Sequence, residues 1–116
     1  MSDIKDLIKK IKQFRDDRDW MQFHDPKNMA VSIVIEAAEL LENFQWKNRQ
    51  EVEQYAKQHR GEIEEEIADI AIYLFELADN LGIDLAKAME RKLEKNAKKY
   101  PAEKARGKHT KYDKLC

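Results

Sequence analysis

Residues 32–41 read SIVIEAAELL and residues 62–74 read EIEEEIADIAIYL, and these two stretches decide the fold. Both favour α-helix, because good helix formers fill them without glycine or proline. In the first stretch, apolar residues cover most of the circumference, which is typical of a helix with little contact with water. A polar stripe nevertheless runs along this helix, and we expect it to face an interior cleft. It consists of Ser32, Glu36, Glu39 and Asn43.

Each helix carries two carboxylates three residues apart, Glu36 with Glu39 and Glu66 with Asp69. Residues at this spacing lie on one face of a helix. Buried carboxylates repel each other and lose hydration, so they need protons or a cation. Oxygen ligands without nearby Cys or His suit Mg²⁺, Mn²⁺ or Ca²⁺. We therefore predict two helices that face each other across a divalent ion held by four carboxylates.

A plainer interpretation is that these acids form the solvent-exposed face of ordinary amphipathic helices. For a single pair of acids at this spacing, that interpretation is the better one. Two such pairs, each embedded in nearly continuous apolar sequence, favour the cation site instead.

Composition bounds the class of protein. The 116 residues suggest one domain, residues 1–116, and a net charge of -1 gives no footprint for nucleic acid. No apolar run reaches the length of a membrane span and no signal peptide opens the chain, so we expect a cytoplasmic protein without a membrane partner. The single cysteine, Cys116, excludes a disulfide framework and a thiolate metal site.

The apolar periodicity predicts an all-α fold of about five helices, near residues 4–18, 26–45, 51–59, 62–81 and 85–100. Asp25 and Asp84 are expected to cap helices, while Gly61 and Gly82 separate them. Residues 102–116 form a basic tail that we expect to be extended. The second and fourth helices are apolar on more sides than one small chain can cover, which indicates a homo-oligomer.

Other chemistries fit the sequence less well. The serines lack a His and acid context, and no glycine-rich phosphate loop is present. A di-iron site needs Glu three residues before His, but Met21, Ala56 and Arg106 stand at those positions. Mg²⁺ chemistry on a phosphorylated ligand remains, in which Lys92 and Asn96 contact phosphates and Trp20, His24 and Trp46 contact a base.

Each of these helper residues also has an ordinary structural explanation. Trp20 and Trp46 fit core or interface positions, and His24 fits a loop or a helix cap. Lys92 and Asn96 fit the surface of an amphipathic helix.

With these residues the sequence resembles the MazG-like all-α nucleotide pyrophosphohydrolases, and within them the dCTP pyrophosphatase branch. The family pattern of ExxE followed by ExxD is met by residues 36–39 and 66–69. Branch-specific stretches match at residues 18–28, 44–47, 69–74, 96–101 and 111–112. The ordered set is far more specific than ExxE alone, and the resemblance spans residues 4–115.

The resemblance implies hydrolysis of a nucleoside triphosphate between its α and β phosphates, and a role in cleaning the nucleotide pool. It implies a helical bundle completed between subunits, as a homodimer or a homotetramer. It implies Mg²⁺ held by the four carboxylates, phosphates near Lys92 and Asn96, and a pyrimidine near four residues. These are Trp20, His24, Trp46 and Tyr73.

Three questions stay open at this stage. Either an additional acid such as Glu65 or Glu62 is the general base, or the metal alone activates the attacking water. The spacer that holds the third helix shapes the base pocket, so the exact base is undecided. A helical interaction module without catalysis, and a related all-α dUTPase-like hydrolase, are the alternatives to a dCTP pyrophosphatase.

Overall fold

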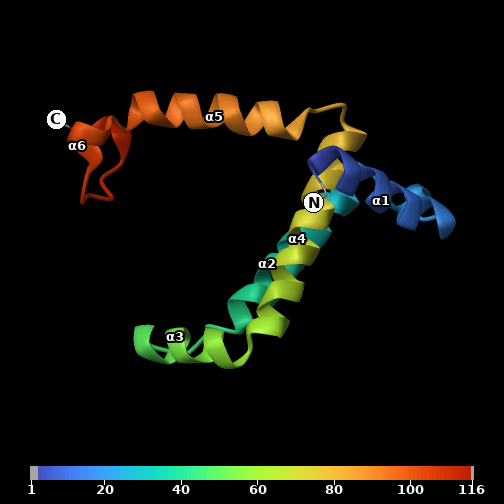
Figure 1. Cartoon of the computed structure of the whole chain (residues 1–116), viewed down its shortest axis with the longest axis horizontal. Coiled ribbons are helices and arrows are strands. Elements are labelled where there is room, and N and C mark those ends of the chain that lie inside the picture. Colours follow the sequence, from blue (N-terminus) through green and yellow to red (C-terminus); the bar gives the residue numbers. More distant parts are fainter. Residues whose placement is uncertain (1–2, 116) are drawn as a thin grey trace. The chain divides into compact units, whose positions relative to one another are not determined.

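The protein is described by a computed structural model that covers residues 3–115, and this part of the chain is all-α, as the sequence predicts (Figure 1). It divides into two compact units, with the boundary between Gly82 and Ile83. The first unit contains α1 (Ile4–Asp17), the 3₁₀ turn η1 (Met21–Phe23), α2 (Pro26–Glu42), α3 (Arg49–Gln58) and α4 (Arg60–Asn80). The second contains α5 (Leu85–Lys99), α6 (Ala102–Ala105) and the 3₁₀ turn η2 (Tyr112–Lys114).

The helix boundaries follow local capping chemistry. The Asp25 carboxylate accepts a hydrogen bond from the Asn28 backbone at 2.9 Å, and Pro26 occupies the first turn, as the sequence predicts. Asn48 and Glu51 form a reciprocal capping box at the start of α3. The predicted break at Gly61 is wrong, because α4 begins at Arg60 and takes in the glycine near its start.

Two further boundaries concern helix ends. Gly82 has φ +71, the left-handed conformation that favours glycine after a last helical turn, so this prediction is confirmed. The second predicted helix ends earlier than expected, at Glu42, and continues into turns that extend to Trp46. Trp46 itself has φ 67, which is rare for a large side chain.

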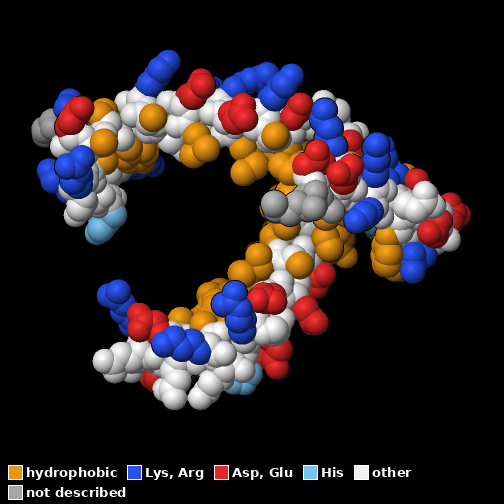
Figure 2. Space-filling model, viewed as in Figure 1, with side chains coloured by type: hydrophobic (Ala, Val, Ile, Leu, Met, Phe, Trp, Pro, Cys, Tyr) orange, Lys and Arg blue, Asp and Glu red, His pale blue; other side chains and the backbone are white. Residues whose placement is uncertain are grey.

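The packing of α2 against α4 is the main contact of the first unit, and α1 and α3 each pack on α4 as well (Figure 1). The core that results is small. Met29 and Ala78 are its buried apolar residues, at 1% and 8% exposed. Hydrophobic side chains remain exposed over α2 and α4 (Figure 2), as in Val34 at 68% and Leu41 at 66%. The first unit therefore leaves much of its apolar surface uncovered.

The second unit has its own local contacts. The rings of Tyr100 and Tyr112 meet edge to face with centroids 6.1 Å apart, and the Lys99 ammonium lies 4.7 Å from the Tyr112 ring. These contacts join the end of α5 to the segment around η2. Within the described residues, no helix is long and apolar enough to cross a membrane.

The near-complete burial of Met29 predicts a large effect of truncation. We expect Met29→Ala to lower the free energy of unfolding by about 2–5 kcal/mol, because a cavity replaces a packed thioether side chain. Urea unfolding at fixed protein concentration measures this difference. Lys27→Ala, at an exposed position of the same helix, is the matched control and should change stability little. An equal loss in both variants would contradict the burial of Met29.

Candidate active site

The two acid pairs of α2 and α4 influence one another in the folded chain. The pKa of Glu36 is raised, first because burial disfavours its charged form and then because it is hydrogen-bonded to Glu39. The negative charges of Glu39, Asp69 and Glu66 raise it further. Charges from both acid pairs therefore act on Glu36 in the folded chain.

Glu36 carries the clearest sign of an unmet interaction. Its Oε2 atom is buried and makes no hydrogen bond within the described residues. A buried carboxylate oxygen without a donor is costly, and a hard cation is the partner that an all-oxygen donor set prefers. The chemistry of these residues thus fits Mg²⁺ or Mn²⁺.

The carboxylates do not, however, form a closed cage. Over residues 3–115, no three Asp, Glu, His or Cys side chains are grouped closely enough to hold a metal ion. Glu39 and Asp69 are exposed, whereas Glu36 and Glu66 are half-buried. This open arrangement suits Mg²⁺, which keeps several waters and combines one or two carboxylates with substrate phosphates.

Glu66 is held by residues of two other segments. Asn43 donates a hydrogen bond to Glu66 Oε2, and Tyr55 of α3 donates to Asn43 Oδ1 at 3.0 Å. Asn43 is 9% exposed and also donates to the Leu40 carbonyl at 3.3 Å. The polar stripe in the sequence includes Asn43, but no sequence signal connects Tyr55 with it, because the contact depends on how α3 folds back on α4.

A pocket of about 710 Å³ lies beside these acids in the first unit. Its walls are mostly apolar side chains of α1 and α4. Five of the predicted site residues line it. They are Trp20, His24, Glu36, Asp69 and Tyr73.

The aromatic residues of the pocket lie close to the acids. His24 is between Trp20 and Tyr73, with ring centroids 6.4 Å and 6.5 Å away. The pKa of Tyr73 is raised by burial and then by the charges of Glu36, Asp69 and Glu76, against the opposing effect of a hydrogen bond with Ser32. An apolar pocket with aromatic rings at one end and carboxylates at the edge can hold a planar ring attached to a charged chain.

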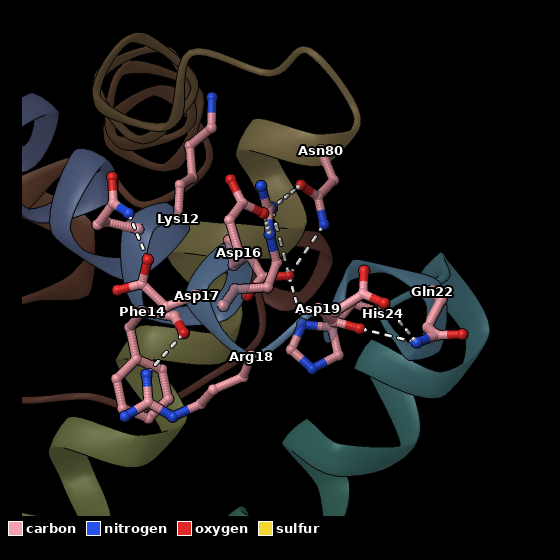
Figure 3. A network of polar contacts seen from close by, with 12 residues as sticks. Lys12, Phe14, Asp16, Asp17, Arg18, Asp19, Gln22, His24 and Asn80 are labelled. Carbon is pink, nitrogen blue, oxygen red and sulfur yellow. Dashed lines mark hydrogen bonds and ion pairs between the residues drawn. The ribbon is translucent and has the colours of Figure 1, made fainter.

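Three residues that the sequence analysis leaves unassigned support His24 from behind. Its Nδ1 atom is 2.7 Å from Glu76 Oε2, and Glu76 also contacts Asn80 and Arg15 (Figure 3). Glu76 is 3% exposed and Arg15 6% exposed. Glu76 and Asn80 are one helical turn apart on α4, but this helix carries several other acids, so the spacing does not single them out in the sequence.

The remaining predicted residues are not among those that line the pocket. Trp46 is 91% exposed, at the positive-φ position after α2. Lys92 and Asn96 lie on α5 in the second unit, where Asn96 is half-buried and Lys92 exposed. Their roles in substrate binding stay predictions.

Comparisons with known proteins agree with this architecture. The sequence profile of the MazG-like family matches residues 31–115. The chain is 37% identical to dCTP pyrophosphatase 1 of Bos taurus over 97% of its own length and 68% of that protein. It is 37% identical to dCTP pyrophosphatase 1 of Homo sapiens over 97% of its own length and 67% of that protein.

A solved structure gives the same result for the fold. The crystal structure of a pyrophosphatase from Archaeoglobus fulgidus DSM 4304 matches with a TM-score of 0.82 and 47% sequence identity. The match covers 87% of this chain and 94% of that one. The chain belongs to the MazG-like family.

The buried oxygen of Glu36 predicts how a cation affects stability. The raised pKa of Glu36 means that the folded state disfavours the charged form of this carboxyl. The protonated carboxyl therefore favours the folded state at low pH, and this contribution is lost as the pH rises through the folded-state pKa. Glu36→Gln should therefore raise the melting temperature of metal-free protein at neutral pH by about 2 °C. Mg²⁺ should stabilise the wild type and have less effect on the variant.

Thermal unfolding at neutral pH, with Mg²⁺ and with EDTA, measures both effects. Glu64→Gln is the matched control, because Glu64 is exposed and, among the described residues, its ion pair is with Arg60 of the same helix at 2.9 Å. Equal Mg²⁺ stabilisation of wild type and Glu36→Gln would show that Glu36 does not bind the ion.

Proposed function

We propose that this chain is a divalent-metal-dependent nucleotide pyrophosphohydrolase that cleaves nucleoside triphosphates between the α and β phosphates. The products are a monophosphate and pyrophosphate. The observation that carries the proposal is the buried, unpartnered Glu36 oxygen at the edge of an aromatic pocket. Membership of the MazG-like family, and relatives that are themselves pyrophosphatases, make an enzyme of this class the fitting assignment.

The four carboxylates supply the ligands for the ion, Glu36 and Glu39 from α2 and Glu66 and Asp69 from α4. A bound divalent ion polarises a phosphoryl oxygen and lowers the pKa of a coordinated water. The Asn43 side-chain amide donates a hydrogen bond to Oε2 of Glu66 and so fixes the orientation of that carboxylate. The half-buried pair shields the reacting phosphate from bulk water, while the two exposed acids leave an entry side.

The pocket supplies the recognition of the base. Trp20 and Tyr73 offer aromatic faces, and His24 between them offers a ring nitrogen. Lys92 and Asn96 of α5 are proposed to contact the phosphates, and Trp46 to contact the base. Glu65, next to Glu66 and exposed, is the candidate for a general base outside the ligand set.

The substrate that we propose is dCTP or a modified dCTP. Its support is the match to proteins named dCTP pyrophosphatase 1 over nearly the whole chain. A dUTPase-like hydrolase and a non-catalytic interaction module are the two competing assignments. A role in removing surplus or altered deoxynucleotides would follow from the first.

Release of pyrophosphate decides between these assignments. We expect Mg²⁺-dependent release from dCTP and its 5-substituted analogues, weaker release from dUTP, and no release in EDTA. Mn²⁺ should substitute for Mg²⁺. Release from dUTP alone would favour the dUTPase-like reading. No release from any triphosphate by folded protein would favour the interaction module.

Substitution of the acids controls that assay. Glu39→Gln and Asp69→Asn should each lower kcat by about 100-fold or more, because each removes a charge that the bound cation needs. Circular dichroism of both variants checks that the helices persist. Wild-type turnover by either variant with Mg²⁺ present would contradict the metal site.

We also propose that the chain functions as a homodimer or a homotetramer. The support is the exposed apolar surface of the first unit, where Ile67 is 51% exposed in addition to Val34 and Leu41. Sedimentation equilibrium should therefore give two or four times the 13.8 kDa mass of one chain. Leu41→Glu should shift the protein toward a single chain. A monomer in the wild type at all concentrations would contradict the proposal.

A further inference from the structure

A buried polar network behind His24 joins α1, the segment before α2, and α4. The contacts run from Arg15 Nη1 to Asn80 Oδ1 at 3.1 Å, from Asn80 Nδ2 to Glu76 Oε2 at 3.1 Å, and from that oxygen to His24 Nδ1 at 2.7 Å. Figure 3 shows His24 and Asn80 pointing toward the centre of this network. Because two of its members are almost fully buried, water does not compete for these hydrogen bonds.

The directions of the hydrogen bonds in this network follow from the chemistry of Arg15 and Glu76. A guanidinium group only donates, so the Asn80 atom that faces it is the acceptor oxygen, Oδ1. The amide nitrogen of Asn80 then faces Glu76 and donates to Oε2. A carboxylate oxygen is an acceptor, so Glu76 Oε2 accepts from His24 as well. The hydrogen of the His24 contact lies on Nδ1.

The consequence for His24 lies at the other edge of its ring. The Arg15 guanidinium is also 3.8 Å from Glu76 Oε2, so that carboxylate has a positive partner besides His24. A neutral imidazole with its hydrogen on Nδ1 has a lone pair on Nε2. Within residues 3–115, the ring makes its hydrogen bond to Glu76 alone, and His24 lines the pocket.

A lone pair at this position distinguishes two classes of pyrimidine. The 4-amino group of a cytosine donates a hydrogen bond to it. The 4-keto oxygen of a uracil or thymine is itself an acceptor, so two acceptors would face each other, and a site built for a donor rejects such a base.

We infer that Glu76 is a positioning residue that fixes the tautomer of His24 and thereby makes the pocket selective for amino-bearing over keto-bearing pyrimidine nucleotides. This inference rests on the proposed function, and it adds to it a residue that acts through His24. Arg15 and Asn80 support this role, because Arg15 orients the Asn80 amide and Asn80 then donates a hydrogen bond to Glu76 Oε2.

Three variants separate positioning from simple structural support. Glu76→Met removes the acceptor at similar volume, and the ratio of kcat/KM for dCTP to that for dUTP should fall about tenfold, as expected for one lost hydrogen bond. Glu76→Gln keeps an acceptor oxygen and should retain the ratio within about threefold. Glu64→Met makes the same chemical change at the exposed residue paired with Arg60, and should leave the ratio unchanged.

The tautomer is measured directly by ¹⁵N NMR of histidine-labelled protein without ligand, with His24 assigned through His24→Gln. We expect a protonated Nδ1 and an unprotonated Nε2 in the wild type, and loss of that pattern in Glu76→Met. The wild-type spectrum needs no variant to fold. An unprotonated Nδ1 would overturn the inference.

The two proposals fail in different ways. Absence of pyrophosphate from every triphosphate in the wild type would overturn the proposed function. Turnover of dCTP with a preference that survives Glu76→Met would leave that function standing and overturn the role of Glu76. An equal fall of the ratio in Glu76→Gln and Glu76→Met would also overturn it, since the acceptor would then not be the cause.

Discussion

The repulsion among four carboxylates on α2 and α4 is the constraint on which the rest of the first unit depends. Helix packing brings Glu36 into partial burial, where three other acids act on it and one of its oxygens lacks a donor. Apolar packing of α2 against α4 must offset this cost. A cation reverses the sign of the interaction, so the same acids that weaken the empty site strengthen the occupied one.

The network behind His24 stabilises a second buried acid, Glu76, by hydrogen bonds and an ion pair. Glu76 is more deeply buried than any of the four acids, yet it has three polar partners. A buried charge that is paired and hydrogen-bonded is tolerated, and one without a donor invites a ligand. The contrast between Glu76 and Glu36, both beside one pocket, separates an acid that organises the structure from an acid that is available for chemistry.

Much of the fold could be predicted from the sequence because it depends on local signals. Asp25 as a cap and Pro26 in the first turn predict the start of α2, and Gly82 predicts the end of α4. Gly61 misled the prediction because a glycine costs little in the first turn of a helix, where backbone groups are unpaired in any case. The acid pairs were visible as spacing on helices, and the charges of Glu39, Asp69 and Glu66 raise the pKa of Glu36, while their role as metal ligands stays a prediction. Arg15, Asn80 and Tyr55 could not be found in this way, since each matters through a partner far away in the sequence.

The order of donors that begins at Arg15 has an evolutionary consequence. Arg15 lies on α1, and its guanidinium bonds to Asn80 rather than to His24. If Glu76 fixes the tautomer of His24 as proposed, a mutation at Arg15 would remove a positive partner of Glu76 and the donor that orients the Asn80 amide, and so would act on the imidazole while His24 itself is unchanged. Base preference in this scaffold would then be a heritable trait that drifts through residues without a bond to the base, and comparison of His24 and its aromatic neighbours alone would miss the change.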